Sequence, residues 1–250
     1  MDLLLGAKGK LGSALSKLLP DTECLDRQGL DVTNRQAVNR LVAQKKPANV
    51  INCTGFTDVD ACEANPGECW KVNVYAVENM LEACEKTGSR LVHFSSDFVV
   101  EPVNEYAKSK LAAEKMVEKH GLAIRTNFYT KDTFIIKKLL QTKEKVPAFA
   151  DQLYNPISIQ SLATEAARLV KTKRTGIANI GTSRAISPFE FATLAAKQFG
   201  LAKGRIVPAS VASMKVPRPK NTFIQPENAL MIEEDLRRFA DGLGKNPEQL

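Results

Sequence analysis

Apolar positions follow two different spacings along the first half of the chain. Short continuous apolar runs are typical of strands buried on both faces, and they predict strands at residues 3–5, 23–25, 50–53, 91–95 and 122–125. Between these runs apolar residues recur every three or four positions, which predicts helices that begin near residues 11, 34, 67 and 106. Strands that alternate with helices in this way predict an α/β fold, a Rossmann-like doubly wound parallel sheet.

The pattern is looser after residue 128. Helices are expected over 132–140, 159–170, 188–199 and 232–243, with one strand at 177–180. No repeat, low-complexity segment or linker separates this half from the first. We therefore expect a first domain at residues 1–128 and a smaller C-terminal lobe at residues 129–250 that interleaves with it.

Composition excludes several classes of protein. Hydrophobic residues make up 44% and charged residues 25% of the 250 positions, as in an ordinary globular chain. No apolar run approaches the ~20 residues that a membrane-spanning helix needs, and the short apolar start lacks the basic residues of a signal peptide. The five cysteines include no Cys-x-x-Cys pair, which indicates reduced thiols in a cytoplasmic protein. No histidine–carboxylate cluster has metal-ligand spacing, so we expect no metal site.

The net charge of +7 is what a lysine-rich solvated surface would give. No basic block is interleaved with aromatic residues, so we expect no nucleic-acid partner. An anionic small ligand such as a nucleotide would also suit this charge.

Glycines occur at every third position over residues 6–12, between an expected strand and an expected helix. Small residues at these positions permit a tight turn and let a pyrophosphate approach the backbone amides, and the helix N-terminus adds favourable partial charge. The pattern therefore predicts a dinucleotide site, with a glycine turn that holds no ligand as the alternative. The predicted site comprises Gly6, Lys8, Gly9, Lys10, Leu11 and Gly12.

Asp26 follows the second expected strand, 20 positions after Gly6. A carboxylate at this place suits the ribose hydroxyls of NADH, whereas Arg27 beside it could meet the 2′-phosphate of NADPH. Lys8 and Lys10 could also bind that phosphate. Both NADPH and NADH remain candidates, and the basic residues favour NADPH.

A further set of polar residues follows the strand expected at 91–95. Tyr106 and Lys110 are four residues apart, so on a helix they share one face. A lysine cation beside the phenol favours the phenolate and lowers the tyrosine pKa, which makes Tyr106 a usable acid or base. Ser96 could hydrogen-bond the same substrate oxygen. These three residues suffice to protonate a carbonyl oxygen while hydride is added to its carbon.

Three neighbours of this set have plainer interpretations. Asp97 either orients the turn after the strand or caps the strand end. His93 lies on the buried strand and is expected to be a packed core residue rather than a base. Glu101 is expected to be solvated, although it could supply an acid to the site.

With these residues identified, the chain resembles the extended short-chain dehydrogenases/reductases and, among them, is most similar to the dTDP-4-dehydrorhamnose reductase family. Five stretches carry the match; the first and fourth are general to the superfamily, and the others are typical of this family. They are residues 6–12 (GAKGKLG), 25–33 (LDRQGLDVT), 52–63 (NCTGFTDVDACE), 95–99 with 106–114 (SSDFV, YAKSKLAAE) and 218–221 (RPKN).

The resemblance implies an NADPH- or NADH-dependent reductase of a nucleotide-linked 4-keto-6-deoxy sugar. Tyr106 would protonate O4 while hydride is added at C4, and Lys110 would hold the nicotinamide ribose and tune Tyr106. Ser96 would complete the catalytic set. The family also implies a homodimer, and a substrate-binding role for the lobe at residues 129–250.

Further contacts follow from the same resemblance. Besides the residues of the glycine turn, Asp26, Arg27, Tyr106 and Lys110, the implied cofactor contacts are Asp31, Val32, Cys53, Thr54 and Gly55. The implied substrate contacts are Ser96, Asp97, Phe128, Arg218 and Lys220.

The chain departs from the family pattern around the sugar pocket. Only residues 97–105 separate Ser96 from Tyr106, where the family has an acidic-glycine turn and a longer loop. Phe128 stands where the family tends to have a tryptophan, and the region after it is short. A regulatory or scaffold protein that binds cofactor without turnover, similar to the β subunit of methionine adenosyltransferase, is therefore an alternative. A nucleotide-sugar epimerase, which shares the catalytic set, is a further alternative.

Overall fold

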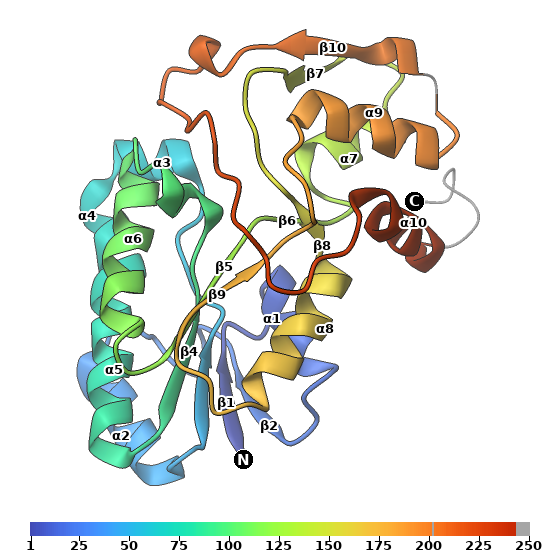
Figure 1. The fold of residues 1–250 in the computed structure, drawn as a ribbon. Helices are drawn as coiled ribbons and strands as arrows, with labels where there is room; N and C mark the ends of the chain where they lie inside the picture. The colour runs from blue at the N-terminus through green and yellow to red at the C-terminus, as the bar shows by residue number, and fades with distance from the viewer. Residues whose placement is uncertain (202, 244–250) are drawn as a thin grey trace.

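The centre of the computed structural model, which describes residues 1–201 and 203–243, is a six-stranded sheet whose neighbouring strands are all parallel (Figure 1). The strand order β2-β1-β3-β4-β5-β9 reverses direction after β2, as in a doubly wound sheet. The predicted α/β, Rossmann-like fold is therefore confirmed. The strands are β1 (Asp2–Leu5), β2 (Thr22–Leu25), β3 (Asn49–Asn52), β4 (Arg90–Phe94), β5 (Leu122–Thr126) and β9 (Gly176–Ile180).

Helices cover both faces of this sheet (Figure 1). One face carries α1 (Lys10–Ser16) and α8 (Ile159–Val170). The other face carries the longer helices α2, α5 and α6, and two short helices and a π-helical turn lead into α5. These elements are α2 (Arg35–Lys45), α3 (Val59–Ala64), α4 (Pro66–Trp70), the turn Lys71–Tyr75, α5 (Ala76–Thr87) and α6 (Glu105–Val117).

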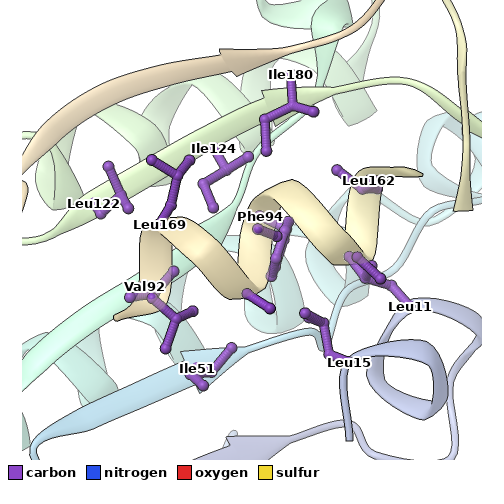
Figure 2. Packing of buried hydrophobic residues seen from close by; sticks show 14 of the residues in the cluster. Leu11, Leu15, Ile51, Val92, Phe94, Leu122, Ile124, Leu162, Leu169 and Ile180 are labelled. Atoms are coloured by element: carbon purple, nitrogen blue, oxygen red, sulfur yellow. The ribbon is translucent and has the colours of Figure 1, made fainter. Parts of the chain in front are cut away.

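Side chains of the strands pack into two separate cores, one on each face of the sheet. Leu4 packs in the cluster beneath α1 and α8, whereas Leu3 and Leu5 pack in the cluster beneath α2 and α5, because successive residues of a strand point to opposite faces. Figure 2 shows the first cluster, in which α8 lies across the sheet and its Leu162 and Leu169 pack with side chains of the strands. Burial of both faces explains why these strands are continuous apolar runs in the sequence. Each fully buried leucine contributes about 1.5–3 kcal/mol.

The remaining elements form a smaller unit with its own core. Its centre is aromatic: the ring of Tyr129 lies 4.9 Å from that of Phe191 and 5.0 Å from that of Phe239. Two short parallel pairs, β6 with β8 and β7 with β10, accompany three helices. The elements are β6 (Phe128–Tyr129), α7 (Phe134–Gln141), β7 (Val146–Phe149), β8 (Ile157–Ser158), α9 (Pro188–Gln198), β10 (Ile206–Ala209) and α10 (Ile232–Leu243).

The chain crosses between the two units more than once. Although α8 and β9 follow residue 128, they return to the six-stranded sheet, so the two units interleave (Figure 1). The division at residue 128 stays a prediction, and residues 202 and 244–250 of the expected lobe lie outside those described. Within the described ranges, no helix is both long and apolar enough to span a bilayer.

An extended segment, residues 214–231, leads from the smaller unit back across the end of the sheet before α10 begins; we call it the strap (Figure 1). Its backbone is held by side chains of the rest of the protein. Asn104 donates to the carbonyl oxygen of Pro217 at 2.9 Å, and Gln152 donates to that of Pro219 at 2.9 Å. The strap thus lies beside the turn that follows β4.

Candidate active site

Two adjoining cavities open at the carboxyl ends of the strands, where ligands bind in doubly wound sheets. One, of about 450 Å³, lies beside the ends of β1 and β2, and the other, of about 580 Å³, beside those of β3, β4 and β5. Gly9 and residues 53–55 line both cavities, so Cys53, Thr54 and Gly55 lie at their junction. The two cavities form one cleft.

The glycine turn forms the start of this cleft. Gly6 has a φ of +82°, a left-handed conformation that favours glycine. The amides of Gly6 and Ala7 both donate to the carbonyl oxygen of Leu25, at 2.9 and 3.0 Å, which joins the turn to the end of β2. A Cβ on Gly12 would lie 2.2 Å from the carbonyl oxygen of Gly6. Gly12 therefore supports the turn from below, while Gly6 and Gly9 line the first cavity.

Asp26 lines the first cavity, but its carboxylate is already engaged. Oδ1 accepts from the amides of Gln28 and Gly29 at 3.0 Å each, and Oδ2 pairs with Lys8. The hydrogen bond from Lys8, followed by that from Gly29, lowers the pKa of Asp26. Both lone pairs of Oδ1 are thus occupied, whereas Oδ2 can still accept one ribose hydroxyl, and Arg27 lines the same cavity as a cation.

Other predicted cofactor contacts divide between the two cavities. Asp31 and Val32 line the first, and the hydroxyl of Thr33 donates to Asp31 at 2.8 Å, which lowers the Asp31 pKa. Lys10 and Leu11 line the second cavity instead.

The predicted catalytic and sugar-binding residues meet in the second cavity. Its lining includes Ser96, Asp97, Tyr106, Lys110 and Phe128. Ser96 follows β4 and caps a 3-10 turn, Asp97–Val100, in which Asp97 is the first residue, whereas Tyr106 and Lys110 lie on α6. The carboxyl end of β4 and the N-terminal part of α6 thus bring them together.

The electrostatics of Tyr106 differ from the expectation. The sequence predicted that Lys110 lowers the tyrosine pKa, but in the structure burial raises the pKa of Tyr106. A hydrogen bond with Ser96 opposes this effect only in part. Lys110 itself contacts other groups, so the phenol stays protonated at neutral pH and is suited to donate a proton.

Lys110 is buried beneath the cavity. Its Nζ donates to the carbonyl oxygen of Phe94 at 2.7 Å and lies 3.2 Å from Nε2 of His93, both on β4. Burial lowers the Lys110 pKa to about 8. His93, expected to be only a packed core residue, is therefore a direct neighbour of a candidate catalytic group.

Asp97 is the acidic group of the second cavity, and it is 1% exposed. Its carboxylate accepts from Ser96 Oγ at 3.2 Å, from Asn127 Nδ2 at 2.8 Å and from Thr222 Oγ1 at 2.6 Å. Burial raises its pKa to about 6, and these hydrogen bonds oppose the rise. Asp97 thus links the Ser96 hydroxyl to Asn127 and to Thr222.

The structure does not bring Arg218 or Lys220 to either cavity lining. Arg218 pairs with Asp60 at 2.8 Å and donates to the carbonyl oxygen of Val216 at 2.9 Å. Lys220 has an exposed side chain, and its backbone amide donates to Glu101 at 2.8 Å. Glu101, expected to be solvated, instead anchors the strap.

Several further groups at the second cavity were not predicted from the sequence. Among the described residues, the buried hydroxyl of Thr126 lines this cavity and has no hydrogen-bond partner. Asn127, which directly follows β5, and Thr222 of the strap both donate to Asp97. Thr126 and Asn127 come directly after the strand expected at 122–125, as Ser96 comes after the strand expected at 91–95. Their position in the sequence could therefore have identified them as site residues. No local pattern marks Thr222.

All five cysteines carry free thiols, and Cys53 at the junction of the cavities has its pKa raised by burial. Within residues 1–201 and 203–243, no three His, Cys, Asp or Glu side chains are placed to hold a metal ion.

Comparison with known families and proteins agrees with this geometry. The family model of the RmlD substrate binding domain matches residues 1–246. A dTDP-4-dehydrorhamnose reductase of Mycobacterium tuberculosis is 27% identical over 253 residues, which cover 88% of this chain and 83% of that protein. A probable low-salt glycan biosynthesis reductase, Agl14, of Haloferax volcanii is 26% identical, covering 89% of both chains.

Solved structures share the whole architecture. A dTDP-4-dehydrorhamnose reductase of Clostridium acetobutylicum superposes with a TM-score of 0.88 at 26% identity, covering 97% of this chain and 99% of that one. The enzyme of the same name from Bacillus anthracis, solved in complex with NADP, gives a TM-score of 0.87 at 25% identity, covering 96% and 98%.

Proposed function

The chain belongs to the RmlD substrate-binding domain family, and from this premise we propose that it is an NADPH-dependent reductase of a nucleotide-linked 4-keto-6-deoxy sugar. One observation carries the proposal: Ser96, Tyr106 and Lys110 line a single cavity that adjoins the glycine turn. The relatives named dTDP-4-dehydrorhamnose reductase support the choice of substrate.

The residues of the cleft fit a dinucleotide. The first cavity has the glycine backbone at its start and the cations Lys8 and Arg27 in its lining, which suit a phosphorylated ribose. The second cavity has an unpaired buried hydroxyl, Thr126 Oγ1, available to a ligand. NADPH, held by these groups and by Lys110, would supply hydride to the substrate. The cations Lys8 and Arg27 beside Asp26 favour NADPH over NADH.

Tyr106 would then act as the proton donor. Its raised pKa keeps the phenol protonated at neutral pH, as the reductive direction requires. Ser96 would hydrogen-bond the same carbonyl oxygen, because its hydroxyl can turn from Asp97, to which it donates at 3.2 Å, towards the substrate. The proton leaves the Tyr106 oxygen as the new O–H bond forms on the sugar.

The experiment is an assay of purified protein with NADPH, then NADH, and dTDP-4-dehydrorhamnose, followed by the loss of reduced-cofactor absorbance. We expect oxidation of NADPH that falls by about 10²–10⁴-fold in Tyr106→Phe, the range for loss of a general acid. Tyr75→Phe is the matched control, because Tyr75 is 54% exposed and lines neither cavity.

Other outcomes of these experiments would contradict the proposed reductase activity. Cofactor binding without oxidation of any nucleotide-linked keto sugar would contradict the reductase and support the regulatory alternative. NAD retained through purification, with interconversion of sugar epimers, would support the epimerase. Failure to bind either cofactor would exclude the dinucleotide site itself.

A further inference from the structure

Lys110 ends a chain of buried polar groups that begins at the junction of the two cavities. From Thr54 the contacts pass through Asn52 on β3 and His93 on β4 to Lys110 on α6. Asn52, His93 and Lys110 are 1%, 0% and 3% exposed. Within such a chain each donor must face an acceptor, because an unpaired buried polar group is costly.

The first link fixes the orientation of Asn52. The backbone amide of Thr54 lies 2.9 Å from Asn52 Oδ1, and an amide N–H can only donate. The Thr54 hydroxyl lies 2.6 Å from the same oxygen. The other end of the Asn52 side chain, Nδ2, therefore points at His93 Nδ1, 3.1 Å away.

This orientation assigns the tautomer of His93. An asparagine Nδ2 carries only donors, so Nδ1 of His93 must be the acceptor and carries no proton. A neutral imidazole then has its proton on Nε2, the atom that lies 3.2 Å from Lys110 Nζ. An imidazolium is excluded by the same contact, because its Nδ1–H would face the Asn52 donors. Burial, and next the charge of Lys110, lowers the His93 pKa, in agreement.

An ammonium at Lys110 has three N–H donors and no lone pair, so it cannot accept from the N–H of His93. A neutral amine can accept this bond and still donate to the carbonyl oxygen of Phe94 at 2.7 Å. We propose that His93 is a positioning residue that presents its Nε2–H to Lys110 and thereby favours the neutral amine. The proposal deepens, and rests on, the reductase function above.

Other features around Lys110 change its pKa, some upward and some downward. On α6, Glu114 favours the charged lysine, as does Cys69 of α4, but burial outweighs both and lowers the Lys110 pKa to about 8. Glu114 is itself paired with Arg125 of β5 at 2.6 Å, which reduces its effect on Lys110. Tyr106, in the same cavity lining, is protonated at neutral pH.

The Lys110 pKa of about 8 brings the loss of its proton close to neutral pH, so the ammonium predominates at pH 7 and the neutral amine predominates above pH 8. A bond from His93 Nε2–H stabilises only the neutral form, so it contributes to lowering this pKa.

The tautomer can be tested directly by NMR of the imidazole nitrogens, because the chain has only two histidines. We expect the His93 signals of the wild-type protein to show a protonated Nε2 and an unprotonated Nδ1 at neutral pH. Exposed His120 serves as the reference, and His120→Phe identifies its signals. A protonated Nδ1 on His93, as the other tautomer or as an imidazolium, would overturn the proposal.

The effect on Lys110 is tested by the pH titration of its ¹³Cε signal, identified by loss in Lys110→Met. Removing the donor with His93→Phe should raise the Lys110 pKa by about one unit, the worth of one hydrogen bond to the neutral form. His120→Phe, the matched control, should leave it unchanged. An unchanged or lowered value in His93→Phe would overturn the proposal.

If His93→Phe does not fold, Asn52→Asp tests the proposal instead, because aspartate keeps the shape of the asparagine side chain. A carboxylate would accept from Nδ1–H, so the His93 proton should move to Nδ1 and the Lys110 pKa should rise. A His93 proton that stays on Nε2 in this variant would contradict the proposed chain of contacts. All these measurements use protein without substrate, so they stand apart from a failure of the reductase assay.

Discussion

The hydroxyl of Thr222 donates to Oδ2 of Asp97 at 2.6 Å, although 125 residues separate the two along the chain. This bond joins the strap to the turn that carries Ser96, whose own hydroxyl donates to the other oxygen of Asp97 at 3.2 Å. A residue of the strap therefore helps to set the position of a candidate catalytic serine through one buried carboxylate.

Asp97→Asn should change how stability depends on pH. Burial raises the Asp97 pKa from its ordinary value of 3.8 to about 6, so the native state disfavours the ionised form. The wild-type advantage of the protonated carboxyl is complete below pH 3.8 and is lost as the pH rises to about 6. This loss amounts to about 2–3 kcal/mol. The unfolding free energy of Asp97→Asn should not show this fall, which urea unfolding at pH 4.5 and at pH 7 measures.

Thr222→Val tests the same linkage in the opposite direction. It removes a hydrogen bond that favours the ionised Asp97, so its unfolding free energy should fall over a wider pH range, and by more in total, than that of the wild type. Parallel pH profiles for the wild type and both variants would show that Asp97 does not titrate as described.

Glu114→Gln should destabilise the fold by about 3–5 kcal/mol, the cost of breaking a buried ion pair. Glu114 is 1% exposed, accepts two bonds from Arg125 at 2.9 and 2.6 Å, and accepts a third from Ser95 at 2.7 Å. Thermal or urea unfolding measures the loss. Glu234→Gln, which breaks an exposed pair with Arg238, is the control and should cost no more than about 0.5 kcal/mol. Equal effects of the two variants would refute the buried pair as a stabilising contact.

Gly12→Ala should damage the glycine turn, because its Cβ would lie 2.2 Å from a backbone oxygen of Gly6. We expect a loss of about 1–3 kcal/mol in stability from overpacking and weaker NADPH binding by fluorescence titration. Gly67→Ala is the control, since nothing lies within 4 Å of the added Cβ. Unchanged NADPH affinity in Gly12→Ala would separate the turn from the cofactor site.

Lys8→Ala should reduce the preference for NADPH. The substitution removes a cation from the first cavity and frees one oxygen of Asp26 to accept from ribose hydroxyls. The ratio of kcat/KM for NADPH to that for NADH should fall by about tenfold, the worth of one charge-assisted hydrogen bond. Lys17→Ala, at the far end of α1, is the control. A ratio that Lys8→Ala leaves unchanged would place the 2′-phosphate away from Lys8.

The sequence by itself determined the α/β architecture, the glycine turn and the positions of Ser96, Tyr106 and Lys110. These features depend on local periodicity and on short spacings, which burial of strands and the pitch of a helix impose directly. Parallel strands then bring their carboxyl ends to one edge, so residues that follow strands meet there without further information.

Tertiary structure alone decided which partners these groups have. Arg218 pairs with Asp60, 158 residues away, rather than lining the cavity, and Thr222 reaches Asp97 across the strap. Burial raises the Tyr106 pKa where the sequence predicted the opposite, and His93 rather than Tyr106 takes the bond with Lys110. Such outcomes depend on desolvation and on contacts between distant segments, which no local pattern encodes.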